Sequence, residues 1–264
     1  MLNAGTVGLG SLTVVGTGIQ VGGHTTAEAK AAIEHAEEVL YLVTDSVAST
    51  WIESLNRNAR SLETLYRPGE RRSESYERIV EEIARSVRRG ADVCVAFYGH
   101  PGVLVNPGQE AVRRVRSEGF SARMLPGVSA EDCLFADLGV DPGRVGCQSY
   151  EATDFLIRRR VPDPTAALIL WQISVLGTVH TAVAPDTSRL PILVEHLQRF
   201  YAADHEVILY EASPYVVCGP LLQHVALSEL GTAEIAPMTT LYIPPVGTRP
   251  VDPEVMDRLG MPRS

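Results

Sequence analysis

The chain has 264 residues, 45% of them hydrophobic, and a formal net charge of −9 at pH 7. This length and apolar content predict an ordered globular protein that buries one large core or two smaller ones. The acidic balance argues against a nucleic-acid partner, because phosphate binding usually leaves a basic footprint. No apolar stretch reaches the ~20 residues that a spanning helix requires, and the N-terminus lacks the pattern of a signal peptide. We therefore expect a cytoplasmic protein with no membrane partner.

Strands and helices alternate through the first half of the chain. Apolar runs predict strands at 12–15, 39–43, 92–98 and 122–125. Apolar spacing and capping signals predict helices from the capping box Thr25-Thr26-Ala27-Glu28 to about Glu38, and at 73–89, 109–117 and 129–137, with Gly90 ending the second and Ser129 capping the last. Such alternation implies a mostly parallel sheet.

A second unit begins around residues 146–153, after a turn-rich segment. We expect strands at 166–171, 206–210 and 239–243, and a helix at 189–201. The polar stretch between Ile173 and Pro191 has no clear periodicity and predicts a long connection, and long ordered loops tend to be functional. These patterns divide the chain into residues 1–145, residues 146–246 and a short tail at 247–264.

Two Gly/Pro turns directly follow predicted strands. The first is Tyr98-Gly99-His100-Pro101-Gly102-Val103, and the second is Pro126-Gly127-Val128-Ser129-Ala130. In an open α/β sheet, ligands bind in the crevice beyond the carboxyl ends of the strands. The turns therefore predict a ligand pocket, with the side chain or backbone of His100 at its border.

Other motifs are less specific. Gly16-Thr17-Gly18 follows a strand, but the third glycine of a GxGxxG fingerprint falls on Val21, so both a simple tight turn and a turn lining another nucleotide-like ligand stay open. The chain contains no Walker A, HExxH or GxSxG pattern. The cysteines and histidines lack metal-ligand spacing, and we expect no metal site.

Tyr66, Arg72 and Tyr76 form a further constellation. Arg72 and Tyr76 are four residues apart and share a helix face if the first turn includes both. An arginine can stabilise an oxyanion, and a phenol can donate or accept a hydrogen bond or, when ionised, remove a proton. Spacing alone nevertheless favours ordinary surface roles for all three.

The whole pattern resembles the tetrapyrrole-methylase-like S-adenosylmethionine-dependent methyltransferases. The similarity runs from about Ser11 to Pro245 and rests on the GTG turn, YGHPGV, LPGVSAEDCLFADLGVDPG, QSYEATDF, LWQI and LYEASPY. Within this superfamily the chain is most similar to the borosin peptide backbone α-N-methyltransferases of RiPP biosynthesis. The resemblance implies two α/β domains with the donor site in the cleft between them, assembled as a homodimer.

The resemblance also implies roles for individual residues. Tyr66, Arg72 and Tyr76 fall on the proposed catalytic positions of the family. The positions that line the pocket of S-adenosyl-L-methionine, whose product is S-adenosyl-L-homocysteine, correspond to Gly16, Gly18, Tyr98, His100, Val103, Ser129, Ala130, Gln172, Ala212, Thr239 and Thr240.

One departure from the fungal borosins concerns the substrate. Those enzymes carry a helical clasp and their own core peptide at the C-terminus, whereas this sequence stops at Ser264. We therefore expect a precursor peptide supplied in trans, as in the split bacterial members, with a heteromeric complex between enzyme and precursor as one arrangement. The alternatives are a tetrapyrrole (corrin or porphyrin precursor) C-methyltransferase and a non-catalytic protein that binds donor or peptide.

Overall fold

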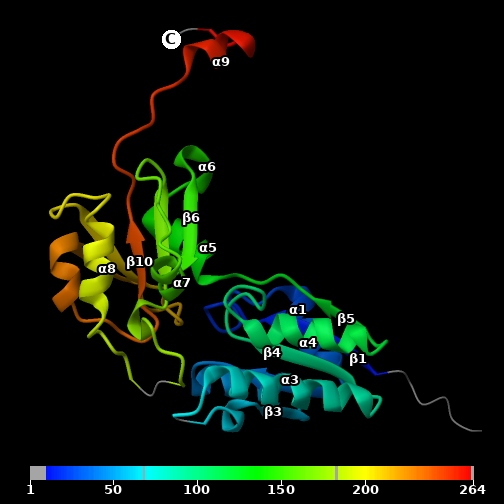
Figure 1. Ribbon diagram of the computed structural model, residues 1–264. Coiled ribbons are helices and arrows are strands. Elements are labelled where there is room, and N and C mark those ends of the chain that lie inside the picture. The colour runs from blue at the N-terminus through cyan, green and yellow to red at the C-terminus, as the bar shows by residue number, and fades with distance from the viewer. Residues whose placement is uncertain (1–9, 68, 182–183, 263–264) are drawn as a thin grey trace, which may run out of the picture. The chain divides into compact units, whose positions relative to one another are not determined.

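The computed structural model describes residues 10–67, 69–181 and 184–262. The chain packs as two compact units, each of which contains its own five-stranded sheet (Figure 1). Unit 1 comprises the chain up to Val140 together with Thr178–Ala184 and Glu211–Leu221. Unit 2 comprises Asp141–Gly177, Pro185–Tyr210 and the chain from Leu222 onward. Two short segments from the second half of the sequence therefore lie with the first unit.

The sheet of unit 1 is parallel throughout, which confirms the prediction from alternating strands and helices. Its strand order is β3-β2-β4-β1-β5. The strands are β1 (Ser11–Gly16), β2 (Glu38–Leu42), β3 (Ala59–Ser61), β4 (Asp92–Phe97) and β5 (Ser121–Met124). The helices are α1 (Ala27–His35), α2 (Ser46–Leu55), α3 (Arg72–Arg88), α4 (Asn106–Ser117) and α5 (Ala130–Leu138), and a 3-10 turn, η1, spans Glu63–Leu65.

The two faces of this sheet bury different side chains because successive residues of a strand point in opposite directions. In β4, Val93, Val95 and Phe97 pack in one core with α3 and α4, whereas Cys94 and Ala96 pack in the other with α1 and α2. Burial raises the pKa of the Cys94 thiol to about 12, as expected for a reduced core cysteine.

Several element boundaries differ from the prediction. Helix α1 is capped by the Thr26 side chain, which accepts from the Ala29 N–H, so the expected box starting at Thr25 is wrong. The same helix ends at His35, because Ala36 is extended and Glu38 already belongs to β2. Helix α4 starts three residues earlier than expected, with a proline in its first turn. Helix α2 and strand β3 were not predicted at all.

Unit 2 contains a mixed sheet in the order β6-β7-β10-β8-β9. Its strands are β6 (Cys147–Glu151), β7 (Ala167–Trp171), β8 (Glu206–Glu211), β9 (Leu221–Ala226) and β10 (Thr240–Ile243). Strand β6 is parallel to β7, and β10 is antiparallel to both β7 and β8.

Helices and 3-10 turns complete this unit: α6 (Pro142–Val145), α7 (Ala152–Ile157), α8 (Leu190–Leu197), α9 (Pro253–Arg258), η2 (Ile173–Val175) and η3 (Leu227–Thr232). Helix α8 ends four residues before the predicted limit, and the expected tail contains α9. Among the helices that the structure describes, none is both long and apolar enough to span a bilayer.

Glycine backbone joins the turn after β1 to the turn after β4. Gly18 and Gly99 exchange backbone hydrogen bonds of 3.3 and 3.0 Å. A Cβ atom on Gly16 would lie 2.1 Å from the Gly99 carbonyl oxygen and 2.8 Å from Cδ of Pro101. The two turns therefore touch at a separation that no side chain can enter.

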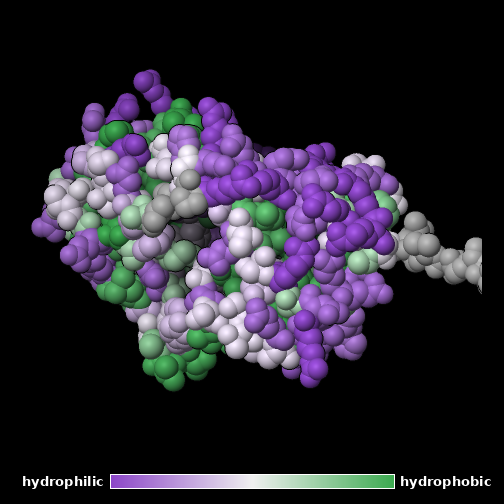
Figure 2. Space-filling view, turned by 90° about the horizontal axis from the view of Figure 1, so that it is seen from below, coloured by the Kyte–Doolittle hydropathy of each residue, from purple (hydrophilic) through white to green (hydrophobic). Residues whose placement is uncertain are grey.

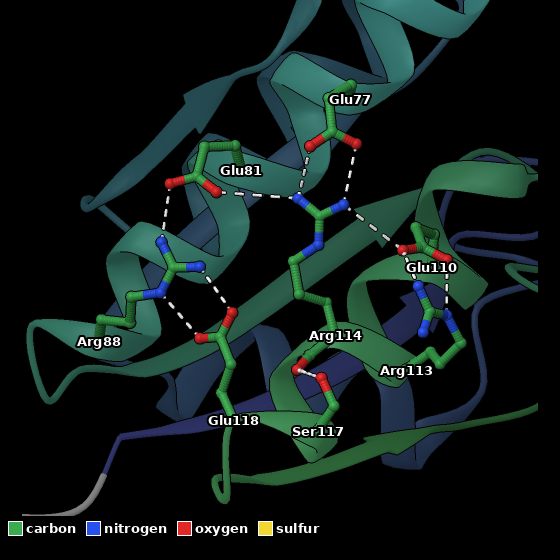
Figure 3. A network of polar contacts seen from close by, with 8 residues as sticks. All are labelled: Glu77, Glu81, Arg88, Glu110, Arg113, Arg114, Ser117 and Glu118. Carbon is green, nitrogen blue, oxygen red and sulfur yellow. Dashed lines mark hydrogen bonds and ion pairs between the residues drawn. The ribbon is translucent and has the colours of Figure 1, made fainter.

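An arginine clamp joins α3 to α4 (Figure 3). The Arg114 guanidinium forms a bidentate pair with Glu77 at 2.7 and 2.8 Å, and it also lies 3.5 Å from Glu110 and 3.7 Å from Glu81. Hydrogen bonds from Arg114 hold the pKa of Glu77 below its ordinary value. The Arg114 side chain is 21% exposed, less than those of Arg88 and Arg113, whereas its partner Glu77 is 61% exposed.

Replacing Gly16 by alanine is expected to force the two turns apart. Overpacking of this kind costs about 1–3 kcal/mol, which lowers the thermal midpoint by roughly 2–12 °C in a domain of this size. Differential scanning calorimetry measures the change, with Gly219→Ala as the matched control because no atom lies within 4 Å of the Cβ added there. Equal midpoints for the two variants would contradict the proposed close contact.

Removing the clamp with Arg114→Ala is expected to lower the free energy of unfolding by about 1 kcal/mol, because one residue supplies several ion pairs. The loss should shrink in 1 M salt, where the Debye length is about 3 Å. Urea titration at both salt concentrations tests this. Arg113→Ala is the control, since that side chain is 70% exposed and pairs with Glu110 at the surface. If Arg114→Ala lowered the free energy of unfolding no more than the control does, the clamp would not contribute to stability.

Candidate active site

The turn after β4 is held in shape by its own backbone. The Tyr98 N–H bonds to the Leu42 carbonyl at 3.2 Å, and Gly99 adopts a φ of +70°. Nδ1 of His100 accepts from the Gly102 N–H at 2.9 Å, so the imidazole folds over its own turn. The predicted donor position Val103 follows in the same turn and is 38% exposed.

The turn after β5 meets the other two. A Cβ atom on Gly127 would lie 3.2 Å from the Gly99 carbonyl oxygen and 3.3 Å from Cα of Gly16. Ser129 then caps α5, as predicted, in a full capping box with Asp132. The carboxyl ends of β1, β4 and β5 are adjacent in the sheet, so their turns converge at the edge where α/β proteins bind ligands.

A cavity of about 270 Å³ lies beside these turns within unit 1. Three segments line it: the loop after β1, the turn after β5 together with α5, and the segment that follows β8. The lining residues are Gln20, His24, Val128, Asp132, Cys133, Ala136, Asp137, Ala212, Ser213, Cys218 and Pro220. Of the predicted donor residues, this list contains Ala212.

Two ionisable groups near this cavity are strongly perturbed. Burial, reinforced by Cys133, Glu211 and Asp45, raises the pKa of Tyr98 to about 12. Burial and the nearby Asp137 and Asp132 raise the pKa of the Cys133 thiol to about 11. The Tyr98 phenol and the Cys133 thiol are therefore uncharged at physiological pH, and each can take part in hydrogen bonds as a neutral group.

The predicted donor residues divide between the two units. Unit 1 holds Gly16, Gly18, Tyr98, His100, Val103, Ser129, Ala130 and Ala212. Unit 2 holds Gln172, Thr239 and Thr240. Gln172 directly follows β7 in the left-handed region, at φ +61°, a conformation that is uncommon outside glycine. Thr239 and Thr240 are buried, and Oγ1 of Thr239 accepts from the Ala236 N–H at 2.9 Å.

The structure brings Tyr66, Arg72 and Tyr76 together. Arg72 and Tyr76 lie in the first turns of α3, and Tyr66 follows η1. The two phenol rings meet edge to face, with centroids 6.1 Å apart. Burial and a hydrogen bond with Tyr76 raise the pKa of Tyr66 well above its ordinary value, while the Arg72 charge opposes the shift. Tyr66 is therefore a proton-bearing phenol.

A short strap, residues 178–181, crosses the start of α3. The Arg72 N–H bonds to the Val179 carbonyl at 3.0 Å, and the Thr181 N–H bonds to the Glu70 carbonyl at 2.9 Å. The Arg72 guanidinium also donates to the Thr178 carbonyl. The strap belongs to the stretch that sequence analysis treated as a long connection. The strap makes these contacts through its own backbone atoms, so no pattern of side chains in residues 178–181 could have predicted them.

A second cavity, also about 270 Å³, opens beside the cluster and is lined by Ser73, Tyr76, Glu77, Val80, Asn106 and Glu110. Glu77 and Glu110 are the residues that the Arg114 clamp holds. In the space-filling view, hydrophilic residues cover much of the visible surface, with hydrophobic residues in smaller groups between them (Figure 2). Across residues 10–67, 69–181 and 184–262, no three His, Cys, Asp or Glu side chains are grouped so as to hold a metal ion.

Curated relatives cover nearly all of this chain. A Gymnopus fusipes protein described as a methyltransferase and ribosomally synthesized cyclic peptide gymnopeptides precursor is 41% identical over 255 residues, which are 95% of this chain and 61% of that protein. A type I borosin cyclic peptide precursor and methyltransferase from Serendipita vermifera subsp. bescii is 39% identical over 96% of this chain and 63% of its own length. The chain thus spans about three fifths of these relatives.

Known structures share the fold. Uroporphyrin-III C-methyl transferase from Thermus thermophilus, complexed with S-adenyl homocysteine, superposes with a TM-score of 0.60 at 18% identity, covering 89% of this chain and 92% of that one. This confirms the predicted tetrapyrrole methylase-like arrangement of two α/β sheets. A family model described as tetrapyrrole (corrin/porphyrin) methylases matches residues 11–218. The chain therefore belongs to the tetrapyrrole (corrin/porphyrin) methylase family.

Proposed function

We propose that this protein uses S-adenosylmethionine to methylate backbone amide nitrogens of a ribosomally made precursor peptide. The observation that carries the proposal is the Tyr66–Arg72–Tyr76 cluster, which combines a guanidinium with two phenols beside an open cavity. The names of the fungal relatives, which pair a methyltransferase with a cyclic peptide precursor, support the substrate class.

The residues present fit a methyl donor. Glycines let the turns at Gly16, Gly99 and Gly127 pack against one another, which brings three strand ends together at the edge where α/β proteins bind ligands. Gly16, Gly18, Tyr98, His100, Val103, Ser129, Ala130 and Ala212 of unit 1 would hold the donor, and Gln172, Thr239 and Thr240 of unit 2 are proposed for the same role. When bound, S-adenosylmethionine supplies an electrophilic methyl group on its sulfonium.

The substrate amide needs activation because its nitrogen lone pair is delocalised into the carbonyl. Arg72, which presents a fork of N–H donors, stabilises the negative charge that develops on the amide oxygen when the N–H proton leaves. Tyr66 stays protonated and suits the same oxygen as a second donor. We propose Tyr76, which lines the cavity, or a water bound beside it, as the acceptor of the amide proton.

A second candidate function is C-methylation of a corrin or porphyrin precursor, which the description of the matching family model favours. Such substrates carry many carboxylates, and a chain with a net charge of −9 offers them a less favourable field than it offers an apolar peptide. A donor-binding or peptide-binding protein without catalysis is the third.

The precursor and the assembly complete the proposal. We infer that this polypeptide accepts a precursor presented as a separate chain, and that it acts as a homodimer. In the relatives, methyltransferase and precursor are named as one protein, so an experiment with two separate polypeptides distinguishes the arrangements. Sedimentation of the purified chain reports its oligomeric state directly.

Co-expression with any small protein that is encoded near this gene and ends in an apolar segment is expected to add ~14 Da increments to backbone amides of that segment. Intact-mass and fragment mass spectrometry locate them. An unmodified precursor would reject the peptide proposal. In that case, release of S-adenosylhomocysteine with uroporphyrinogen III would support the tetrapyrrole alternative, and donor binding without turnover would support the binding-only alternative.

Arg72→Ala and Tyr76→Phe are each expected to lower the turnover number about 10²–10³-fold, because each removes a group that acts on the developing oxyanion or the leaving proton. Donor affinity should change little, as measured by calorimetry with S-adenosylhomocysteine. Arg71→Ala is the matched control, since that side chain is exposed at the start of the same helix. Near-normal turnover in either variant would remove that residue from the mechanism.

A further inference from the structure

One oxygen of a half-buried carboxylate at the end of β8 is shielded from solvent and has no partner in the described structure. Oε2 of Glu211 is shielded from solvent, and none of the described residues hydrogen-bonds to it. No described arginine, lysine or histidine forms an ion pair with this side chain either. Buried polar atoms in folded proteins are almost always hydrogen-bonded, and buried carboxylates are usually paired, so an orphan of this kind calls for an explanation.

The surroundings of Glu211 point to a ligand. Glu211 directly precedes Ala212, which lines the 270 Å³ cavity. It also lies close enough to Tyr98 to act on that phenol electrostatically. Ala212 and Tyr98 are both residues that we propose for donor binding. Glu211 therefore lies next to one residue that we propose for donor binding and close to another, on a segment that packs with unit 1.

We propose that Glu211 is a further donor-binding residue, whose carboxylate accepts an N–H or O–H group of S-adenosylmethionine. The donor carries an α-ammonium, ribose hydroxyls, an adenine amine and a positive sulfonium, and each of these satisfies an acceptor that the protein itself leaves unpaired. This inference rests on the proposed use of S-adenosylmethionine and is independent of the peptide substrate.

The charge of the region agrees with this role. Asp45 also acts electrostatically on Tyr98, so two carboxylates bias the space around that phenol toward a cation. Burial raises the pKa of Glu211, which shows that the isolated protein holds this group in an environment unfavourable to its charged form. A cationic ligand relieves that cost, and S-adenosylmethionine carries more positive charge than its product.

The test is calorimetric titration of S-adenosylmethionine into the full chain and into Glu211→Gln, without any peptide. A charge-assisted hydrogen bond of ordinary strength predicts dissociation constants about 10- to 100-fold higher in the variant. Glu206→Gln is the matched control on the same strand: its side chain is 66% exposed and pairs with His224, and its affinity should stay within about twofold of the parent.

Two further ligands identify the contacted group. If S-adenosylhomocysteine is weakened as strongly as S-adenosylmethionine while methylthioadenosine is unaffected, Glu211 binds the amino-acid end. Weakening of all three ligands assigns it to the nucleoside, and weakening of S-adenosylmethionine alone assigns it to the sulfonium charge. Each of these results supports the proposal.

Unchanged affinity of Glu211→Gln for all three ligands would overturn it. Thermal unfolding is measured in parallel. If the Glu211 charge had no ligand role, its removal would raise the midpoint of thermal unfolding and leave binding unchanged. Should Glu211→Gln fail to fold, Glu211→Asp retracts the carboxylate by one methylene and takes its place: weakened binding supports the proposal and parental binding rejects it. A chain that binds donor through Glu211 yet methylates no peptide contradicts only the proposed substrate.

Discussion

Contact between backbone turns at the carboxyl ends of β1, β4 and β5 is the constraint on which the rest of unit 1 depends. Gly16, Gly99 and Gly127 approach so closely that any Cβ atom at the first of them would overlap a neighbouring carbonyl. The contact fixes the positions of the turns that carry Tyr98, His100 and Ser129. It also brings three strand ends together at the edge of the sheet where α/β proteins bind ligands.

Helix α3 carries two of the three residues that we propose for catalysis, and it is anchored at its start and further along its length. The 178–181 strap pairs with the chain that enters the helix, and the Arg114 clamp ties Glu77 to α4. Tyr76 lies between these two anchors. Because a displacement of about 1 Å can cost two orders of magnitude in rate, we expect such anchoring to matter for the proposed catalysis as much as for stability.

Four of the five strands of unit 1 were predictable because apolar residues between capped helices mark them, whereas β3, with the sequence Ala-Arg-Ser, was not. Helix α2 was not, since its sequence is rich in serine and β-branched residues, and it depends on the Asp45 cap and on burial of Ile52. Strand β9 could not be predicted either, because its first four residues are exposed at a sheet edge and no buried apolar run marks it. The cluster of Tyr66, Arg72 and Tyr76 came from family resemblance, while spacing alone had favoured surface roles. Glu211 left no trace in the sequence, because an unpaired acceptor becomes visible only when its surroundings are known.

The strap has a consequence for synthesis on the ribosome. Arg72 and Thr178 are 106 residues apart in the chain, yet the guanidinium of one bonds to the carbonyl of the other. At roughly 5–20 residues per second, Thr178 is polymerised about 5–20 s after Arg72. The parallel sheet of unit 1 has all its strands by then, whereas the arginine has not acquired its partner. The sheet of unit 1 can therefore fold on the ribosome before Arg72 acquires this contact, so the proposed reaction site is assembled only after residue 178 has been added.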